Sequence, residues 1–534
     1  MISVKTTSVQ VKNTLYNSPA INAYLENHKA LSPFLSQLPS PQSVVDQISQ
    51  KQFSEIARNI LSDALLNQYK QSGIQLDAHS PVLKNIETLR QANAYTVTAG
   101  QQIHAYLGPG LVINKILSVI SLAKACSERT EHPIIPIFWM ATEDHDFDEI
   151  NHLKLFGKEF KWENPDGLSG PVGRKKNTGL AEMGQEIKEL FKNDPQTSEW
   201  IEVMIQAYEK SDHYAAASRK IIHQIFENTG LVVIDPDDVS LKTEFKDILL
   251  REIENPTAHL ISAYDEVLKS LHVKPQIHPR ETNLFIIDEG KRERLIKKEN
   301  SFQLLPSEKY YTPSSLKQLL SDSPEIFSPN VALRPIYQET ILPNLAYVAG
   351  GSEMIYWFQI RKIFEAYQIP YPVVWLRSSA IYLPSSVVDF IQNTGLTMEN
   401  MFSDPESIQL KLAEYTQQIK SGPITINKKI SNLLNQLEED FRSCEWFDTK
   451  TLEQIRILKK DQHHLSKVLA EKFDEHVMNL PQIRKLIKLK TQFFTEKQER
   501  LETSVQFLKY ALELIYNKDI IKFSTSSTIT LVIS

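Results

Sequence analysis

Residues 134–152 read Ile134-Ile-Pro-Ile-Phe-Trp-Met-Ala-Thr-Glu-Asp-His-Asp-Phe-Asp-Glu-Ile-Asn-His152, an apolar run that passes directly into five acids and two histidines. A short apolar run rich in Ile, Phe and Trp is typical of a buried parallel strand. In open α/β sheets, ligands bind just beyond the carboxyl ends of such strands. We therefore expect Glu143, Asp144, His145 and Asp146 to lie at the edge of a ligand crevice. A solvated acidic turn is the alternative explanation of the same charges.

A strand, a glycine-rich loop and a helix are predicted immediately upstream, over residues 94–123. Gly100, Gly108 and Gly110 allow the backbone to approach a ligand, and Pro109 suits a first helical turn. The amides at the start of the helix could then hold an anion, with Lys115 adding a charge. The loop matches neither the Walker pattern nor the dinucleotide fingerprint, so a purely structural turn is the alternative.

The same order of strand, glycine turn and helix recurs later, with the strand at 345–349, Gly350-Gly351 in the turn and the helix at 352–367. Glu353 near the helix start is favoured by the helix dipole whatever its function. Arg334 precedes Pro335, which favours an extended backbone. Its guanidinium could fork onto a carboxylate or phosphate, or form an interdomain ion pair.

These segments together resemble the bacillithiol biosynthesis cysteine-adding enzymes, a family of cysteine ligases. The residues that carry the resemblance are Ala99-Gly-Gln-Gln102 with Gly108-Pro109 and Lys115, then Phe138 to His152, then Arg334-Pro335, Gln338, Leu342-Pro343 and Gly350-Gly-Ser-Glu353 with Tyr356-Trp357. The resemblance implies an enzyme that completes a low-molecular-weight thiol by joining the cysteine carboxylate to the amine of glucosaminyl-malate as an amide. It also implies a nucleotide-activated carboxylate, and hence ATP with Mg²⁺ and no stably bound metal.

The fold that the resemblance implies is α/β, with a Rossmann-like nucleotide-binding core, two inserted connective segments and a C-terminal α-helical coiled-coil domain. The expected parts are a helical lead-in at 1–90, core at 91–156, a connective insertion at 157–230, core at 231–255, a second insertion at 256–330, core at 331–394, the coiled coil at 395–516 and a tail at 517–534.

The resemblance and the motifs together suggest a set of substrate- or nucleotide-binding residues. They are Gly100, Gln101, Gln102, Gly108, Pro109, Lys115, Trp139, Glu143, Arg334, Gln338, Gly350, Gly351, Glu353 and Arg377. His145, between Asp144 and Asp146, is the expected general base, because a neighbouring carboxylate can orient an imidazole and stabilise its charged form. The same acids could instead hold Mg²⁺ against phosphate oxygens.

Two other classes of function remain open. A metal-dependent hydrolase would use Asp144, His145, Asp146 and His152, although no second His-rich cluster follows a predicted strand. A non-catalytic coiled-coil scaffold would account for the C-terminal region but not for the crevice motifs.

Composition limits the partners and the cellular location that we expect for the protein. The chain has 534 residues, 59 basic and 65 acidic, for a net charge of −6, so no global field would draw it to nucleic acid or anionic lipid. Cys126 and Cys444 have no spacing that suggests a disulfide or a zinc site. No signal peptide and no 18-residue apolar run are apparent. We expect a cytoplasmic protein that does not span a membrane.

The remaining patterns give weaker predictions. After Gly395 only Gly422 interrupts the chain, and apolar residues recur at helical spacing from Ile426 to Phe441 and from Leu501 to Leu512, which predicts a helical hairpin or coiled coil and a homodimer through it. Residues 231–234 predict a strand, with Asp235 and Asp237 as weaker site candidates. The alternative is that Asp238 or Ser240 caps the next helix. Lys291-Arg-Glu-Arg294 is interpreted as a charged loop with a solvated face, or alternatively as a phosphate contact. Residues 525–534 favour an added edge strand.

Overall fold

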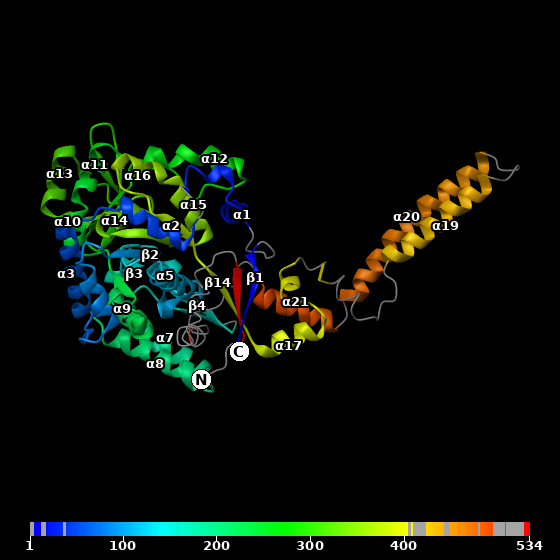
Figure 1. Ribbon diagram of the computed structural model, residues 1–534, viewed down its shortest axis with the longest axis horizontal. Helices are drawn as coiled ribbons and strands as arrows, with labels where there is room; N and C mark the ends of the chain where they lie inside the picture. The colour runs from blue at the N-terminus through cyan, green and yellow to red at the C-terminus, as the bar shows by residue number, and fades with distance from the viewer. Residues whose placement is uncertain are drawn as a thin grey trace. The chain divides into compact units, whose positions relative to one another are not determined.

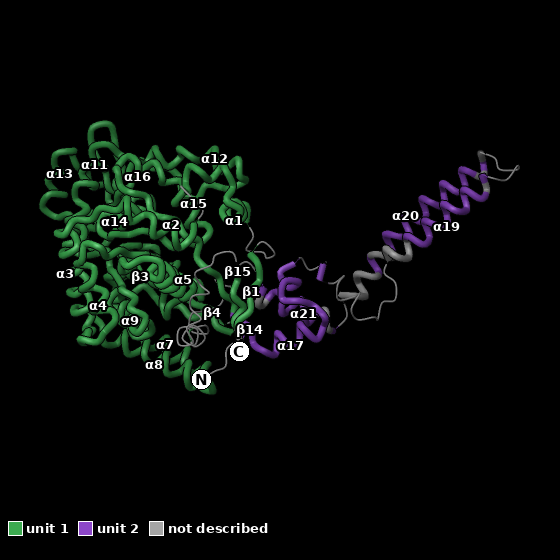
Figure 2. Tube along the Cα trace, viewed as in Figure 1, with its two compact units in different colours: residues 1–12, 17–381, 499–532 green, residues 13–16, 382–498, 533–534 purple. Residues whose placement is uncertain are grey.

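The computed structural model describes residues 5–11, 18–35, 39–156, 158–403, 407–408, 423–442, 449–478, 481–494, 508 and 528–533. It divides into two compact units (Figure 2). Unit 1 comprises residues 1–12, 17–381 and 499–532, and unit 2 comprises residues 13–16, 382–498 and 533–534.

Unit 1 is built on a five-stranded parallel sheet in the order β13-β12-β2-β3-β6, of which β2 and β3 are labelled in Figure 1. Its strands are β2 (Tyr95–Gln101), β3 (Ile134–Met140), β6 (Val232–Ile234), β12 (Asn344–Ala349) and β13 (Val373–Leu376). The chain runs outward from β2 to β3 and β6, then returns to the other side of β2. This is the strand order of a Rossmann-type sheet, and its switch point lies between β2 and β12. The Rossmann-like core expected from the sequence is therefore confirmed.

The strands of this sheet are almost wholly buried, which explains why they read as continuous apolar runs instead of alternating ones. Helix α5 (Leu111–Ser127) links β2 to β3 and is buried along most of its length. A hydrophobic core extends from β3, β6 and β12 into α3 (Glu55–Gln71), α14 (Arg334–Ile341), α15 (Gly351–Gln359) and α16 (Arg361–Tyr367). The core thus holds both sides of the switch point in place.

The N-terminal helices begin at serine caps, because a serine hydroxyl accepts a hydrogen bond from an otherwise unpaired amide of the first turn. Ser18, Ser40 and Ser80 cap α1 (Pro19–Leu25), α2 (Pro41–Asp46) and α4 (Pro81–Thr88), and a proline follows each serine. Proline suits this position because its missing N–H would have no partner there. Pro41 and Pro81 therefore start helices.

A three-stranded sheet joins the beginning and the end of the chain in the order β1-β15-β14. Its members are β1 (Lys5–Gln10), β15 (Thr528–Ile533) and β14 (Ser379–Leu383). Two predictions need correction here. The lead-in is not helical throughout, since it starts with a strand, and the C-terminal strand lies at the centre of its sheet instead of at an edge.

The first connecting segment (residues 141–231) lies between β3 and β6 and is mainly helical. It contains α6 (Phe147–Ile150), a hairpin of β4 (His152–Leu155) and β5 (Lys158–Lys161), η5 (Val172–Arg174), α7 (Leu180–Leu190), α8 (Pro195–Glu209), α9 (Tyr214–Phe226) and η6 (Glu227–Thr229).

The second connecting segment (residues 235–343) lies between β6 and β12 and carries an antiparallel sheet in the order β10-β9-β8-β7-β11. The strands are β7 (Leu284–Asp288), β8 (Lys291–Lys297), β9 (Phe302–Leu305), β10 (Tyr310–Tyr311) and β11 (Phe327–Pro329). The helices are α10 (Val239–Glu244), capped by Asp238, then α11 (Lys246–Glu254), η7 (Ala258–Tyr264), α12 (Asp265–Ser270), α13 (Pro313–Asp322), η8 (Pro324–Ile326) and α14.

Two predictions in this segment were wrong. Lys291-Arg-Glu-Arg294 is not a loop but the start of β8, with Glu293 and Leu295 buried on one face. Arg334 is not extended but opens α14, because Pro335 falls in the first helical turn, where proline is tolerated.

Unit 2 is helical in its described residues, apart from the ends of β14 and β15. Its elements are α17 (Ser385–Asn393), η9 (Glu399–Phe402), α19 (Pro423–Arg442), α20 (Thr449–Met478) and α21 (Pro481–Phe493). Helices α19 and α20 pack side by side (Figure 1), and Lys459 pairs with Glu438 at 2.6 Å between them. Leu501, Val505 and Leu512 lie outside the described residues. No helix within the described ranges has the length and apolar character that crossing a bilayer requires.

Candidate active site

A pocket of about 820 Å³ opens in unit 1 at the carboxyl ends of the parallel strands. Its lining comes from the ends of β2, β3 and β12, from the acidic turn after β3 and from the second connecting segment. The lining residues of the core and the acidic turn are Gly100, Gln101, Gln102, Lys115, Trp139, Ala141, Glu143, Asp144, His145, Glu149, Tyr347, Ser352, Glu353 and Tyr356. Those of the second segment are Pro236, Gln276, Ile277, His278, Arg280, Thr282, Phe285, Arg292, Arg294, Pro329, Asn330, Val331 and Arg334. The crevice predicted at the end of β3 is therefore present.

Gly100 is required where the sheet meets the pocket. A Cβ built at Gly100 would lie 2.9 Å from the Tyr347 hydroxyl oxygen, closer than carbon and oxygen atoms normally approach. That hydroxyl donates to Glu353 Oε1 at 2.5 Å, and Tyr356 donates to the same oxygen at 3.2 Å. The absence of a side chain at position 100 thus leaves room for the polar network around Glu353.

Lys115 and Glu353 form an ion pair at 2.5 Å in which both side chains are largely buried. Lys115 also donates to the Gly100 carbonyl at 2.7 Å, and the Gly350 amide donates to Glu353 Oε2 at 3.0 Å. Burial lowers the pKa of Lys115, and although burial opposes ionisation of Glu353, Lys115 outweighs it and lowers the pKa of that carboxyl. Lys115 therefore neutralises Glu353, which the phosphate-binding prediction did not anticipate.

Arg334 is a buried cation in the wall of the pocket. Its guanidinium lies over the rings of Tyr347 and Trp139, at 5.2 and 5.8 Å from their centroids, and NH1 donates to Gln338 Oε1 at 3.1 Å. Its NH2 is buried and has no hydrogen-bond partner within the described part of the chain, and the same holds for Trp139 Nε1. Buried donors are nearly always paired, so each of these two needs an acceptor, from water or from a bound molecule, although the Tyr356 hydroxyl also interacts with the Arg334 guanidinium.

Glu143 belongs to a buried charge network at the side of the pocket. It pairs with Lys242 at 2.8 Å, and Lys242 also pairs with Asp237 at 2.9 Å. Arg174 binds Asp237 through two nitrogens at 2.6 and 2.7 Å. Burial raises the pKa of Glu143, while the two carboxylates outweigh burial and raise the pKa of Lys242. The network fixes the acidic turn to α10.

Asp144 is held by polar contacts on both of its oxygens. Gln102 donates to Asp144 Oδ2 at 2.7 Å and to Glu149 Oε2 at 2.6 Å, and the backbone N–H of His145 donates to Asp144 Oδ1 at 2.8 Å. Burial opposes ionisation of Asp144, but its contacts with His145, Arg292 and Gln102 outweigh burial and lower its pKa. Asp146 is exposed at the start of α6 and does not line the pocket.

Arg292 contacts His145 across the pocket wall. Its NH1 lies 3.0 Å from His145 Nδ1, its Nε donates to Ser328 Oγ at 2.9 Å and its NH2 donates to the Pro329 carbonyl at 2.8 Å. The guanidinium also lies over the Phe285 ring, 4.0 Å from its centroid. With His278, Arg280 and Arg294 it makes this wall basic.

The sequence interpretation did not assign these basic residues to the site, because it favoured a solvated face for the run at 291–294 and gave a phosphate contact only as the alternative. The sequence feature that could have revealed them is the alternation of side chains along β8. Glu293 and Leu295 are buried, while Arg292 and Arg294 line the pocket.

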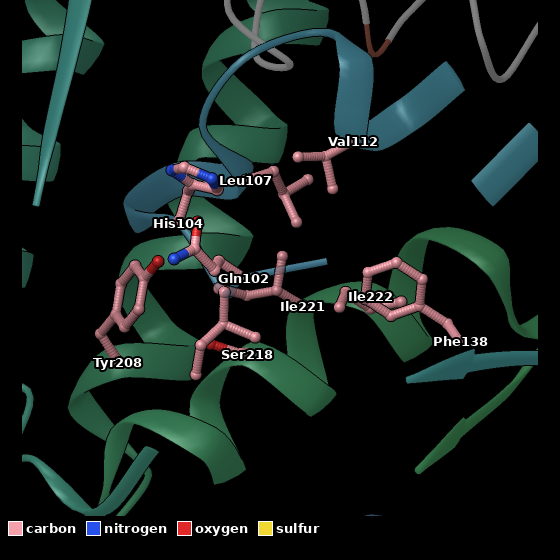
Figure 3. A pocket seen from close by; sticks show the side chains of 10 residues that line it. Gln102, His104, Leu107, Val112, Phe138, Tyr208, Ser218, Ile221 and Ile222 are labelled. Carbon is pink, nitrogen blue, oxygen red and sulfur yellow. The ribbon is translucent and has the colours of Figure 1, made fainter. Parts of the chain in front are cut away.

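The predicted phosphate loop lines this pocket only in part, since Gly100 and Lys115 line it and Gly108 and Pro109 do not. Gly108 has a φ of +57°, and a Cβ there would lie 2.3 Å from His104 Cβ, so the loop closes over its own histidine. A separate cavity of about 10 Å³, room for one water, lies beside His104, Gln102 and Tyr208 (Figure 3). Burial lowers the pKa of His104 to about 4. Gly108 and Pro109 therefore serve the loop, not the pocket.

Four other candidates support the pocket from behind or lie beside it. Gln338 accepts from Arg334, and Gly350 donates to Glu353. Gly351 packs on Ile21, where an added Cβ would meet Ile21 Cδ1 at 3.1 Å. Arg377 donates to Ser378 O at 3.2 Å and to Ser379 Oγ at 3.1 Å. None of the four lines the pocket.

The metal-dependent hydrolase gains no support from the geometry. Across the residues that the structure describes, no group of three or more His, Cys, Asp or Glu side chains is arranged to hold a metal ion. His152 lies on β4, where its Nδ1 contacts Asn151 Oδ1 at 3.2 Å, and it does not line the pocket. The ligand set that this alternative requires is therefore not assembled.

The fold and the pocket define an α/β protein of Rossmann type with a charged crevice at its switch point. The model of the family described as "Bacillithiol biosynthesis BshC, N-terminal Rossmann-like domain" matches residues 4–378. Candidate cysteine ligases named BshC are 30% identical to this chain in Flavobacterium johnsoniae, over 96% of this chain and 99% of the relative, and in Cytophaga hutchinsonii, over 92% of each. The BshC of Bacillus cereus is 28% identical over 77% of this chain and 82% of the relative. The chain belongs to the BshC family of bacillithiol biosynthesis.

Proposed function

We propose that this protein is a ligase that joins cysteine to glucosaminyl-malate as an amide in the pocket between β2, β3 and β12. The observation that carries the proposal is the buried NH2 of Arg334, which has no hydrogen-bond partner among the described residues, in a pocket whose wall also holds Arg280, Arg292 and Arg294. The malyl group of glucosaminyl-malate brings two carboxylates, and guanidinium groups match carboxylates in charge and geometry. Membership of the BshC family supports the same substrate.

The acidic turn after β3, next to Arg292, suits the aminosugar. Asp144 and Glu149 share the amide of Gln102, so two carboxylates converge on one point of the wall. They would attract the ammonium form of the sugar amine, which must lose a proton before it attacks the cysteine carbonyl carbon. Because both oxygens of Asp144 already accept hydrogen bonds, we assign the proton to Glu149, which lines the pocket and is exposed.

Amide formation needs an activated carboxylate, and ATP with Mg²⁺ would supply that activation. The residues predicted to hold its phosphates do not fit the role, since Gly108 and Pro109 do not line the pocket and Lys115 is bonded to Glu353 and Gly100. The proposal therefore derives no step through the nucleotide. ATP is a component of the assay, and the assay measures whether the reaction requires it.

The test is mass-spectrometric detection of bacillithiol made by the purified full chain from cysteine, glucosaminyl-malate, ATP and Mg²⁺. Each component is omitted in turn, and AMP and ADP are measured alongside. We expect product only when both substrates are present, and loss of product in a Glu149→Gln variant of about 100- to 10,000-fold. Absence of product with ATP and with every other nucleoside triphosphate would overturn the proposal.

A further inference from the structure

The contact between Arg292 and His145 determines which ring nitrogen of the histidine carries hydrogen. An arginine side chain has only donors and stays protonated, so the 3.0 Å contact from NH1 requires an acceptor at His145 Nδ1. A neutral imidazole with a bare Nδ1 carries its hydrogen on Nε2. We infer that Arg292 holds His145 in this tautomer, so that His145 offers the pocket an N–H donor instead of the general base expected from the sequence.

Arg292 is anchored too firmly to give up this contact easily. Ser328 Oγ and the Pro329 carbonyl hold its other nitrogens at 2.9 and 2.8 Å, and Phe285 lies against its plane. Its side chain is only 8% exposed. The guanidinium is therefore held by three groups other than His145. It positions the imidazole, and the imidazole does not position it.

Asp144 does not hold His145 in the other tautomer, in which the hydrogen is on Nδ1. In an acid–histidine pair that makes a base, a carboxylate accepts from Nδ1–H and leaves Nε2 free to take a proton. Here Asp144 Oδ1 lies 3.6 Å from Nδ1, beyond hydrogen-bond distance, and already accepts the backbone N–H of His145 at 2.8 Å. A hydrogen on Nδ1 would also face the Arg292 donor at 3.0 Å.

The role of this donor rests on the proposed function. His145 lines the pocket and its side chain is 35% exposed, so Nε2–H is available to a bound molecule. When the amine attacks the carbonyl carbon of the activated cysteine, negative charge develops on the acyl oxygen, and the carbonyl re-forms as the bond to the activating group breaks. A fixed N–H donor stabilises such an oxygen without itself gaining or losing a proton. Arg292 is then a positioning residue, because it acts through His145.

The tautomer can be read directly by nitrogen NMR of the full chain labelled on its 14 histidines. Signals of His145 are those that disappear in His145→Gln. We expect the bare nitrogen to be Nδ1 in the wild type and the pattern to change in Arg292→Leu. Arg294→Leu is the matched control, since Arg294 also lines the pocket and lies over Phe285, at 6.0 Å. A hydrogen on Nδ1 at neutral pH, alone or with Nε2–H, would overturn the inference, and the wild-type spectrum decides this even if Arg292→Leu does not fold.

Activity separates a donor from a base. Glutamine can place an N–H near the position of Nε2 but cannot serve as an imidazole base, so His145→Gln should stay within about tenfold of the wild type. His145→Ala should lose about 100- to 1,000-fold in kcat, the usual effect of removing one such donor. Equal losses in both variants contradict the donor role. An inactive wild-type protein contradicts the proposed function instead, while the NMR spectrum still decides the tautomer.

Discussion

Arg334 is the residue on which anion binding should depend most. Its NH2 is buried without a partner among the described residues, and a carboxylate there would gain a charge-assisted hydrogen bond of about 1.5–3 kcal/mol. Arg334→Met should therefore weaken binding of glucosaminyl-malate about 10- to 150-fold in calorimetric titration. Arg361→Met is the control, because Arg361 stacks on Tyr371 at 4.5 Å but does not line the pocket. Equal losses in the two variants would contradict this role of Arg334.

Asp237 should make the protein sensitive to acid. Burial opposes its ionisation, but Arg174 and Lys242 outweigh burial and lower its pKa to about 2, against about 3.9 in an unfolded chain. The folded state thus binds fewer protons between these values, so the stabilisation from Asp237 is complete above about pH 4 and is lost as the pH falls towards 2.

Asp237→Asn should lower the thermal midpoint near neutral pH, and its difference from wild type should shrink from pH 4 to pH 2. The shift of about two pKa units corresponds to about 2–3 kcal/mol. Exposed Asp247→Asn serves as the control. A wild-type advantage that is the same at pH 2 and pH 7 would rule out this account of Asp237.

At the scale of elements, the turn between β7 and β8 sets the position of Arg292. A Cβ at Gly170 would lie 1.9 Å from the Gly290 carbonyl oxygen in that turn, and the Arg292 amide donates to Ser169 O at 3.1 Å. Gly170→Ala must therefore displace the turn and, two residues later, Arg292.

We expect Gly170→Ala to weaken glucosaminyl-malate binding about tenfold, which corresponds to about 1.4 kcal/mol. Gly167→Ala is the control, since a Cβ there meets nothing within 4 Å and adds only the strain of a φ of +67°. Unchanged affinity in Gly170→Ala, measured by the same titration, would show that the turn does not place the basic wall.

The elements also show how far the sequence could predict the site. The strands ending at Gln101, Met140 and Ala349 were predictable, because buried parallel strands are long apolar runs and ligands bind at their carboxyl ends. The basic wall was not, since β8 alternates charged residues whose pocket side is defined only by strands far away in sequence. Arg334 was assigned to the site but to the wrong backbone conformation, because a proline is compatible with both a helix start and an extended segment.

At the scale of the whole molecule, the paired helices α19 and α20 expose apolar side chains. These include Leu433 at 66%, Leu437 at 40% and Leu458 at 49%. We propose that a second copy covers this stripe, since an exposed apolar face on paired helices is typical of a protein contact. Leu433→Glu with Leu437→Glu should convert a dimer into a monomer in light scattering, while Leu190→Glu, exposed on α7, should not. A monomeric wild type would contradict the proposed dimer.

The most direct test of the central claim is the rate of bacillithiol formation by the Arg334→Met and Arg361→Met variants, compared with the wild type under identical conditions. If the pocket at the switch point is where cysteine is added, Arg361→Met should keep the wild-type rate, and Arg334→Met should lose about 10- to 150-fold in kcat/KM. A wild-type rate in Arg334→Met would place the reaction outside this pocket.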